Sequence, residues 1–256
     1  MILKAKYKRM RKLSYIFILI ILPVISFGNK QLMVDVEYAK GQYKEAAAGY
    51  QQMVNDGYKS AVIYYNLGNA YYKLGDIPAA LLYYEKAHKL SPGDEDINFN
   101  IRYANLKTTD KVDDVPEFFL TRWGRAFILS CSLSTLSVLS IIFILMGSGV
   151  LIVYFFANKF NIKKFSFYAA MLLFFLGLLT VFIAGRQSSY FDNHKQAIIF
   201  TGTVDVKGGP AAESKTLFVI HDGTKVSVLE SNSNWIKIGL ANGNVGWIRA
   251  SDAKEI

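Results

Sequence analysis

The side chains that could carry out acid–base, nucleophilic or metal chemistry are scattered along this sequence. None of the three histidines, His88, His194 and His221, has a second ligand at a spacing typical of a metal site. The acidic runs at 94–96 and 113–114 lie at a predicted helix start and in a polar linker, where carboxylates cap helices or remain solvated. The sequence also lacks a GxSxG motif, a phosphate-binding glycine loop and a dinucleotide fingerprint. We therefore expect no enzymatic activity, no metal site and no cofactor.

Residues 61–92 carry an ordered pattern that predicts a helical hairpin. Bulky and small residues recur there at the spacing of two packed helices, and Gly75 followed by Asp76 ends the first helix and opens the second. The positions that carry the pattern are Tyr64, Leu67, Gly68, Tyr71, Ala80, Tyr84, Ala87 and Pro92. This pattern closely resembles the tetratricopeptide repeat (TPR), with Tyr64 in place of the usual tryptophan.

The TPR resemblance implies a peptide-binding groove lined by the first helix of the pair. The implied groove residues are Val62, Tyr65, Asn69, Tyr72 and Lys73. The two tyrosines offer apolar area with a polar tip, and Asn69 can hydrogen-bond both the donors and the acceptors of an extended peptide. The alternative is that some of these tyrosines only pack between helices.

A weaker repeat and a capping helix flank this stretch and define a module at 29–107. In 29–60 the second helix keeps the pattern, whereas Val34 and Glu37 replace the small residue and the tyrosine expected in the first helix. Residues 94–107 have helical periodicity but place Arg102 where a full repeat has glycine, so we interpret them as a capping helix. About three repeats are usually needed for a stable core, so we expect the module to pack on a partner, a second copy or the membrane segments.

The basic residues indicate membrane topology rather than nucleic-acid binding. Residues 1–14 hold six basic residues and no acidic one, 157–166 hold three lysines, and together they account for the net charge of +9. A basic start, an uncharged run and the small residues Ser26 and Gly28 predict a secretory signal peptide at 1–28. An uncleaved signal anchor is the alternative, and both predict that the chain from residue 29 onward crosses the membrane.

Two apolar runs predict transmembrane helices. After a polar linker and interfacial segment at 108–125, residues 126–157 and 165–185 carry no charge and are long enough to span a bilayer. The lysines of the intervening turn, 158–164, place that turn in the cytoplasm, so both soluble parts lie on the opposite side. The single cysteine, Cys131, lies in an apolar run, and an intrachain disulfide is excluded.

Three serines in the first apolar run predict a helix-packing face. Ser130, Ser134 and Ser137 have the spacing of one helical face, where small hydroxyl residues allow close approach and interhelical hydrogen bonds. We expect this face to pack on 165–185 or on a helix of a partner. The alternative is that a long, tilted helix simply tolerates serines.

The last part of the chain, 186–256, has an all-β pattern. Runs of alternating apolar residues are separated by turn signals, one at 221–223 and one at Asn242 and Gly243. From Leu217 onward the chain resembles the bacterial SH3-like (SH3b) domain, on the residues at 222–226, 235 and 246–248.

The SH3b resemblance implies that exposed aromatic residues bind peptide or cell-wall material. Trp235 is the best candidate because it faces opposite to Ile236, Ile238 and Leu240 on its strand. Trp247 is expected to pack at the end of the barrel.

The complete order of segments resembles the BatE-like family of bacterial aerotolerance operons. The expected fold class is a multidomain membrane protein with all-α TPR helical hairpins, two transmembrane helices and a small all-β SH3-like barrel. The family implies an inner-membrane location with both soluble domains in the periplasm. It also implies BatA- and BatB-like partners, which are membrane proteins with von Willebrand A domains, and a MoxR-type AAA+ ATPase that acts from the cytoplasm.

Two functions are consistent with this organisation. In the first, the protein is a scaffold that binds envelope proteins through the TPR groove and the SH3-like domain. In the second, it is a cell-wall-sensing module that binds peptidoglycan through the SH3-like domain. A transporter or channel subunit is disfavoured because neither apolar run contains an acidic or basic residue that would mark a pathway.

Overall fold

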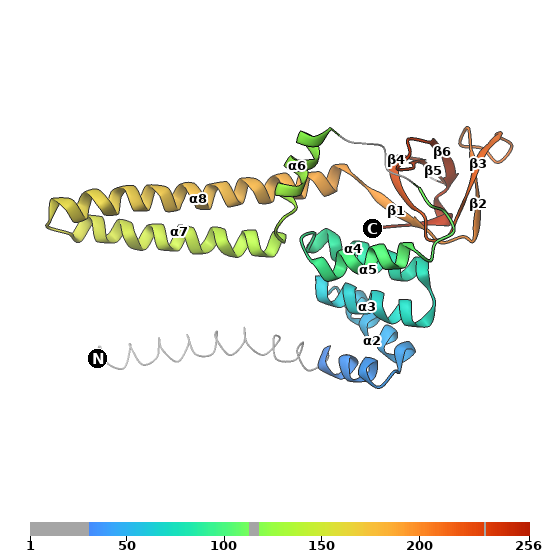
Figure 1. Ribbon diagram of the computed structural model, residues 1–256, viewed down its shortest axis with the longest axis horizontal. Coiled ribbons are helices and arrows are strands. Elements are labelled where there is room, and N and C mark those ends of the chain that lie inside the picture. Colours follow the sequence, from blue (N-terminus) through green and yellow to red (C-terminus); the bar gives the residue numbers. More distant parts are fainter. Residues whose placement is uncertain (1–30, 113–117, 233) are drawn as a thin grey trace, which may run out of the picture.

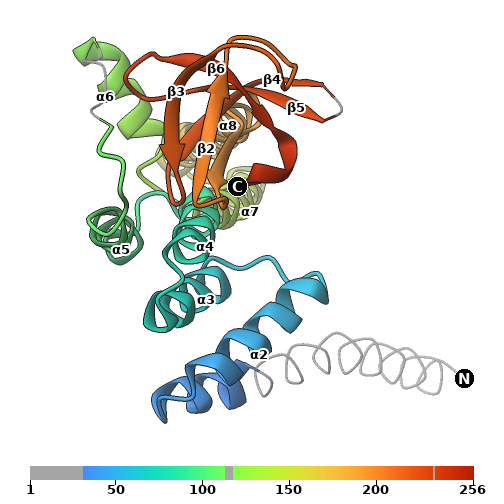
Figure 2. The same ribbon diagram turned by 90° about the vertical axis from the view of Figure 1, so that its right-hand side faces the viewer.

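The computed structural model describes residues 31–112, 118–232 and 234–256, and the signal peptide predicted at 1–28 lies outside them. Three parts follow one another along the chain: a helical module, a long antiparallel pair of helices and a β-sheet (Figure 1). The helical module and the sheet lie side by side at one end of the helical pair (Figures 1 and 2).

The helical module consists of a helical segment at 31–39 and four further helices. These are α2 (Tyr43–Asn55), α3 (Ala61–Leu74), α4 (Ile77–Leu90) and α5 (Glu95–Asn105). Gly75, with a φ of 82°, ends α3 in the left-handed conformation, and the carboxylate of Asp76 accepts the N–H of Ala79 at the start of α4. Gly68 lets α3 approach α4 closely, because a Cβ there would lie 2.6 Å from Cδ1 of Tyr84.

Two further helices are long and apolar enough to cross a membrane, α7 (Leu133–Phe156) and α8 (Phe160–Asn193). They run antiparallel and pack along their length (Figure 1). Small residues lie at this contact: a Cβ on Gly177 would lie 3.1 Å from Cγ1 of Ile144, and one on Gly147 would meet the ring of Phe174 at 3.2 Å. A shorter helix, α6 (Phe119–Ile128), precedes α7 and contacts α8.

The helix boundaries differ from the apolar runs of the sequence. The run at 126–157 begins inside α6 and is interrupted at 129–132, because the hydroxyl of Ser132 accepts the N–H of Thr135 and caps the start of α7. The second run, 165–185, is only the central part of α8, which continues to Asn193 directly before the sheet. Residues 186–193 of α8 are mostly polar and extend the helix beyond its apolar part.

Seven antiparallel strands form one sheet in the order β3-β2-β6-β5-β4-β1-β7. They are β1 (Gln196–Ile199), β2 (Thr203–Lys207), β3 (Thr216–His221), β4 (Lys225–Asn232), β5 (Trp235–Gly239), β6 (Val245–Arg249) and β7 (Ala253–Glu255). The expected barrel is not closed: among the described residues β7 pairs only with β1, and β3 is the other edge. The sheet therefore stays open around its apolar core.

The sheet packs on the helical module through β1 and the C-terminal residue. Ile198 of β1 is fully buried and joins an apolar cluster that includes Leu81 of α4. Beside this cluster, Nζ of Lys225 lies 2.8 Å from Oε2 of Glu85, whose side chain is 5% exposed. The contact covers α4, and it leaves the side of the module formed by α3 and α5 open.

Candidate partner-binding surfaces

The predicted groove residues share one helix but differ in exposure. Val62 and Lys73, at the two ends of α3, are exposed, whereas Tyr65, Asn69 and Tyr72 are half-buried. The three half-buried side chains point toward neighbouring helices of the module, as their ring contacts and hydrogen bonds show.

Tyr65 and Asn69 belong to a hydrogen-bond network inside the module. Oδ1 of Asn69 accepts the hydroxyl of Tyr84 at 2.8 Å and the amide Nδ2 of Asn100 at 2.9 Å. The same Nδ2 lies 3.1 Å from the hydroxyl oxygen of Tyr65. These bonds join α3, α4 and α5, so Tyr65 and Asn69 hold the three helices together. For Tyr65 this is the packing role that the sequence left open as the alternative.

An open aromatic surface continues from α3 onto α5. The rings of Tyr72 and Tyr103 have centroids 5.7 Å apart, and Tyr103 stacks on Phe99 at 6.0 Å with an interplanar angle of 8°. Phe99 is 57% exposed and Tyr103 is 48% exposed. We call Tyr72, Phe99 and Tyr103 the α3–α5 aromatic patch.

Sequence reasoning missed the α5 part of this patch, although a signal for it exists. Phe99 and Tyr103 follow Tyr65 and Asn69 at the 34-residue period of the repeat, and the exposed Leu106 follows Tyr72 in the same way. The capping helix therefore presents its side chains at the groove positions of a third repeat.

A small polar pocket lies between the first helical segment and α3. Asp35, Tyr38, Tyr50 and Asn66 line a cavity of about 170 Å³. The hydroxyl of Tyr50 donates to the carboxylate of Asp35, and burial together with this bond raises the pKa of Tyr50. The partly buried carboxylate of Asp35 would repel the carboxylate of a peptide C-terminus, so the pocket does not suit that kind of ligand.

The sheet has a second candidate surface on the outer side of β5 and β6. Trp235 is half-buried, pairs across the strands with Arg249 and lines an open pocket of about 440 Å³ together with Asn234 and Ser251. Its strand neighbour Ile236 points into the core, as the alternation predicts. Arg249 is exposed and forms no ion pair within the described part of the chain.

Trp247 lies on this same outer side rather than in the core of the sheet. It pairs across the strands with Lys237 and with Lys207, and Nζ of Lys237 is 6.0 Å from its ring centroid. We call Trp235, Lys237, Trp247 and Arg249 the β5–β6 outer face. Lys237 is paired with Glu230, so Arg249 is the cation beside the two rings that can bind an anionic ligand with apolar or sugar surface.

The three serines of the predicted packing face are not gathered against α8. Ser130 lies in the turn before α7, where its hydroxyl donates to the carbonyl of Phe127, and Ser134 and Ser137 are exposed on α7. The α7 residues that are buried instead are Leu136, Ser140 and Gly147. Ser130 therefore shares no helical face with the other two, whose packing on a partner's helix stays a prediction.

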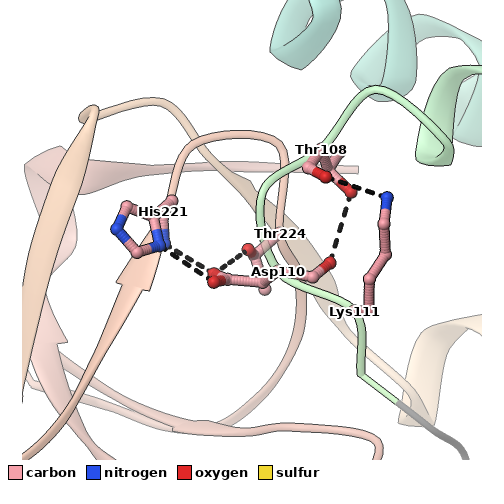
Figure 3. Close-up of polar contacts among 5 residues, drawn as sticks. All are labelled: Thr108, Asp110, Lys111, His221 and Thr224. Carbon is pink, nitrogen blue, oxygen red and sulfur yellow. Dashed lines mark hydrogen bonds and ion pairs between the residues drawn. The ribbon is translucent and has the colours of Figure 1, made fainter.

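A carboxylate of the linker joins the helical module to the sheet. Oδ2 of Asp110 accepts the backbone N–H of His221 at 2.6 Å and the hydroxyl of Thr224 at 2.7 Å, and Oδ1 lies 2.9 Å from Nδ1 of His221 (Figure 3). Partial burial by itself raises the pKa of Asp110, but these hydrogen bonds outweigh it and lower that pKa below its ordinary value. Lys111, which donates to the carbonyl of Thr108 at 2.8 Å, holds the same linker turn (Figure 3).

Comparisons with known proteins identify the two kinds of module. Residues 61–94 match the tetratricopeptide repeat family, and residues 202–254 match the bacterial SH3 domain family. A solved NlpC/P60 family protein from Bacillus cereus is 18% identical with a TM-score of 0.21, and the likeness covers 28% of this chain and 23% of that one. A comparison with curated proteins gave no match. The chain therefore contains a TPR repeat and a bacterial SH3 domain, which suggest protein–protein interaction or cell-wall binding.

Proposed function

We propose that this TPR- and SH3-containing chain is a membrane-anchored scaffold of a bacterial envelope complex. The observation that carries the proposal is the α3–α5 aromatic patch, which remains open while the sheet occupies α4 on another side of the module. Exposed rings that stack on one another are pre-ordered, so they offer apolar contact area at a low entropic cost. A partner segment with apolar side chains is the ligand that fits this surface.

Membrane anchoring rests on α7 and α8. Both helices have the length and apolar composition of a span, and Lys159, Lys163 and Lys164 cluster at the turn between them. With that turn in the cytoplasm, the helical module and the sheet both face the periplasm of a bacterial inner membrane. The BatE-like resemblance supports this location, and it points to BatA- and BatB-like proteins of an aerotolerance complex as partners.

The test of the groove is the double substitution Phe99→Ala with Tyr103→Ala in the full-length protein. A photoreactive residue at position 106 in cells would capture the partner, and mass spectrometry would identify it. Each truncated hot-spot ring costs about 1–2 kcal/mol of binding, so the two together cost about 2–4 kcal/mol, and we expect the captured amount to fall at least about 30-fold in the double variant.

The matched control is Leu74→Ala, which removes a similarly exposed apolar side chain of α3 away from the patch. This control should leave the capture unchanged. Equal capture by the double variant and the control would refute the groove as the partner site. Tyr65 and Asn69 are unsuitable for the test, because their substitution would also disturb the network that joins three helices.

A second function, peptidoglycan binding, is supported by the β5–β6 outer face. Trp235 and Arg249 together present a ring for stacking and a cation for a carboxylate, and both groups are accessible from the same pocket. Purified cell wall should pull down the detergent-solubilised chain, and Trp235→Ala should abolish this sedimentation while Phe99→Ala does not. A wild-type chain that stays in the supernatant would exclude cell-wall binding and leave the scaffold function in place.

A further inference from the structure

Helix α6 has one apolar face that nothing in the described chain covers. Phe119, Leu120, Trp123 and Phe127 lie on this face, and between 52% and 67% of each side chain is exposed. The opposite face carries Thr121, Gly124 and two arginines, Arg122 and Arg125. Burying these four large side chains is favourable, so the exposed face needs an apolar environment that the chain itself does not provide.

The position of α6 along the chain determines which environment it meets. Only residues 129–132 separate α6 from α7, and four residues reach at most about 14 Å. The 24 residues of α7 extend about 36 Å, slightly more than the roughly 30 Å of a hydrocarbon core, so its first residue lies near one surface of the bilayer. Helix α6 is therefore held close to that surface, at the end of the hairpin opposite the lysine-rich turn (Figure 1).

Two contacts fix the turn that connects α6 to α7. The side chain of Gln187, which is buried in α8, donates through Nε2 to the carbonyl of Cys131 at 3.0 Å. On the other side, the turn abuts the loop between α4 and α5, since a Cβ on Gly93 would lie 2.3 Å from the carbonyl oxygen of Ser130. The position of α6 relative to the bilayer surface is therefore fixed by contacts of its connecting turn with α8 and with the helical module.

We propose that α6 lies in the membrane interface on the side of the soluble modules, with Phe119, Leu120, Trp123 and Phe127 inserted among the lipids. The partner of this surface is a phospholipid bilayer. Aromatic side chains favour the headgroup region, and an amphipathic helix parallel to the membrane buries its apolar face there. Arg122 on the polar face reaches the phosphates, so the binding favours anionic lipid. The proposal goes beyond partner binding, and it requires only that α7 and α8 span the membrane.

The test places a single tryptophan in α6. The chain has three tryptophans, so the double substitution Trp235→Phe with Trp247→Phe leaves Trp123 as the only indole. The purified protein is reconstituted into vesicles of phosphatidylcholine and phosphatidylglycerol that contain phosphatidylcholine brominated either near the glycerol end or near the chain end. We expect Trp123 to lose most of its emission with the first lipid, to lose little with the second, and to be shielded from acrylamide.

The matched control keeps Trp247 as the only indole, through Trp123→Phe with Trp235→Phe. Its emission should be independent of bromination, and flotation of both variants with the vesicles reports anchoring by α7 and α8 separately. Emission of Trp123 that is quenched by acrylamide but by neither lipid would overturn the proposal. If Trp123 is shielded from acrylamide but not quenched by either lipid, the apolar face of α6 binds a second copy or a protein partner. If lipid brominated near the chain end quenches Trp123 more strongly, α6 lies inside the bilayer core. Either result would also refute the proposal.

Discussion

Replacing Asp110 with alanine should loosen the contact between the helical module and the sheet. Its carboxylate accepts two hydrogen bonds from His221 and one from Thr224. Hydrogen bonds to a charged group contribute about 1.5–3 kcal/mol each, but the three are not additive and the side chain is partly exposed, so we expect a total loss of about 2–4 kcal/mol. This free energy concerns docking of the linker on the sheet, not unfolding of the sheet.

Hydrogen exchange of the His221 amide measures this loss directly. The amide donates to Asp110, and it should exchange at least about 30-fold faster in Asp110→Ala, since a factor of ten corresponds to about 1.4 kcal/mol. Asp222→Asn is the matched control, because it removes a carboxylate of the same turn whose side chain has no hydrogen-bond partner in the described residues. Unchanged exchange in Asp110→Ala, or an equal effect of the control, would refute the reasoning.

The pH dependence of the contact follows from the lowered pKa of Asp110. A carboxyl group whose pKa is lower in the folded state stabilises that state above its ordinary pKa, near 3.8, and this stabilisation is lost as the pH falls through the lower folded value. The contribution of the Asp110 carboxyl group to the protection of the His221 amide should therefore stay constant from neutral pH to about pH 5 and decline only below about pH 4.

Three further variants test the packing of the two modules. Gly68→Ala should destabilise the helical module by about 1–3 kcal/mol in thermal unfolding, because the new Cβ would lie 2.6 Å from the ring of Tyr84. Gly246→Ala should destabilise the sheet by a similar amount, about 1–3 kcal/mol by the same assay, since its Cβ would lie 2.4 Å from Cγ1 of Val206. Burial lowers the pKa of His88, so the free energy of unfolding should fall by up to about 1.4 kcal/mol per pH unit below pH 6.5 in denaturant titrations, and His88→Leu should remove this slope.

Local patterns were sufficient to predict the helices of the module and most strands of the sheet. Gly75 ends one helix through its backbone conformation, and Asp76 starts the next through its side chain. These two residues therefore predict the helix boundary without information from distant parts of the chain. The orientation of Trp235 away from the core likewise follows from strand alternation alone.

Features that depend on distant residues could not be predicted in this way. Asp110 and His221 are 111 residues apart in sequence, and nothing near either residue indicates the other. The roles of Tyr65 and Asn69 depend on whether Asn100 reaches them, which a helical pattern does not reveal. The prediction of a closed barrel was wrong for a similar reason. Closure depends on pairing between the edge strands β3 and β7, and the residue pattern within a strand does not reveal that pairing.

The uninterrupted length of α8 has a mechanical consequence. Its 34 residues extend about 51 Å, and in the proposed membrane arrangement the eight residues after the apolar run, 186–193, project about 12 Å beyond the hydrocarbon core and lead into β1 after two further residues. Such a helix acts as a lever: tilting it by about 10° about its cytoplasmic end would displace the attached sheet by about 9 Å. In that arrangement, a change in the tilt of α8 within the bilayer would change the position of the sheet.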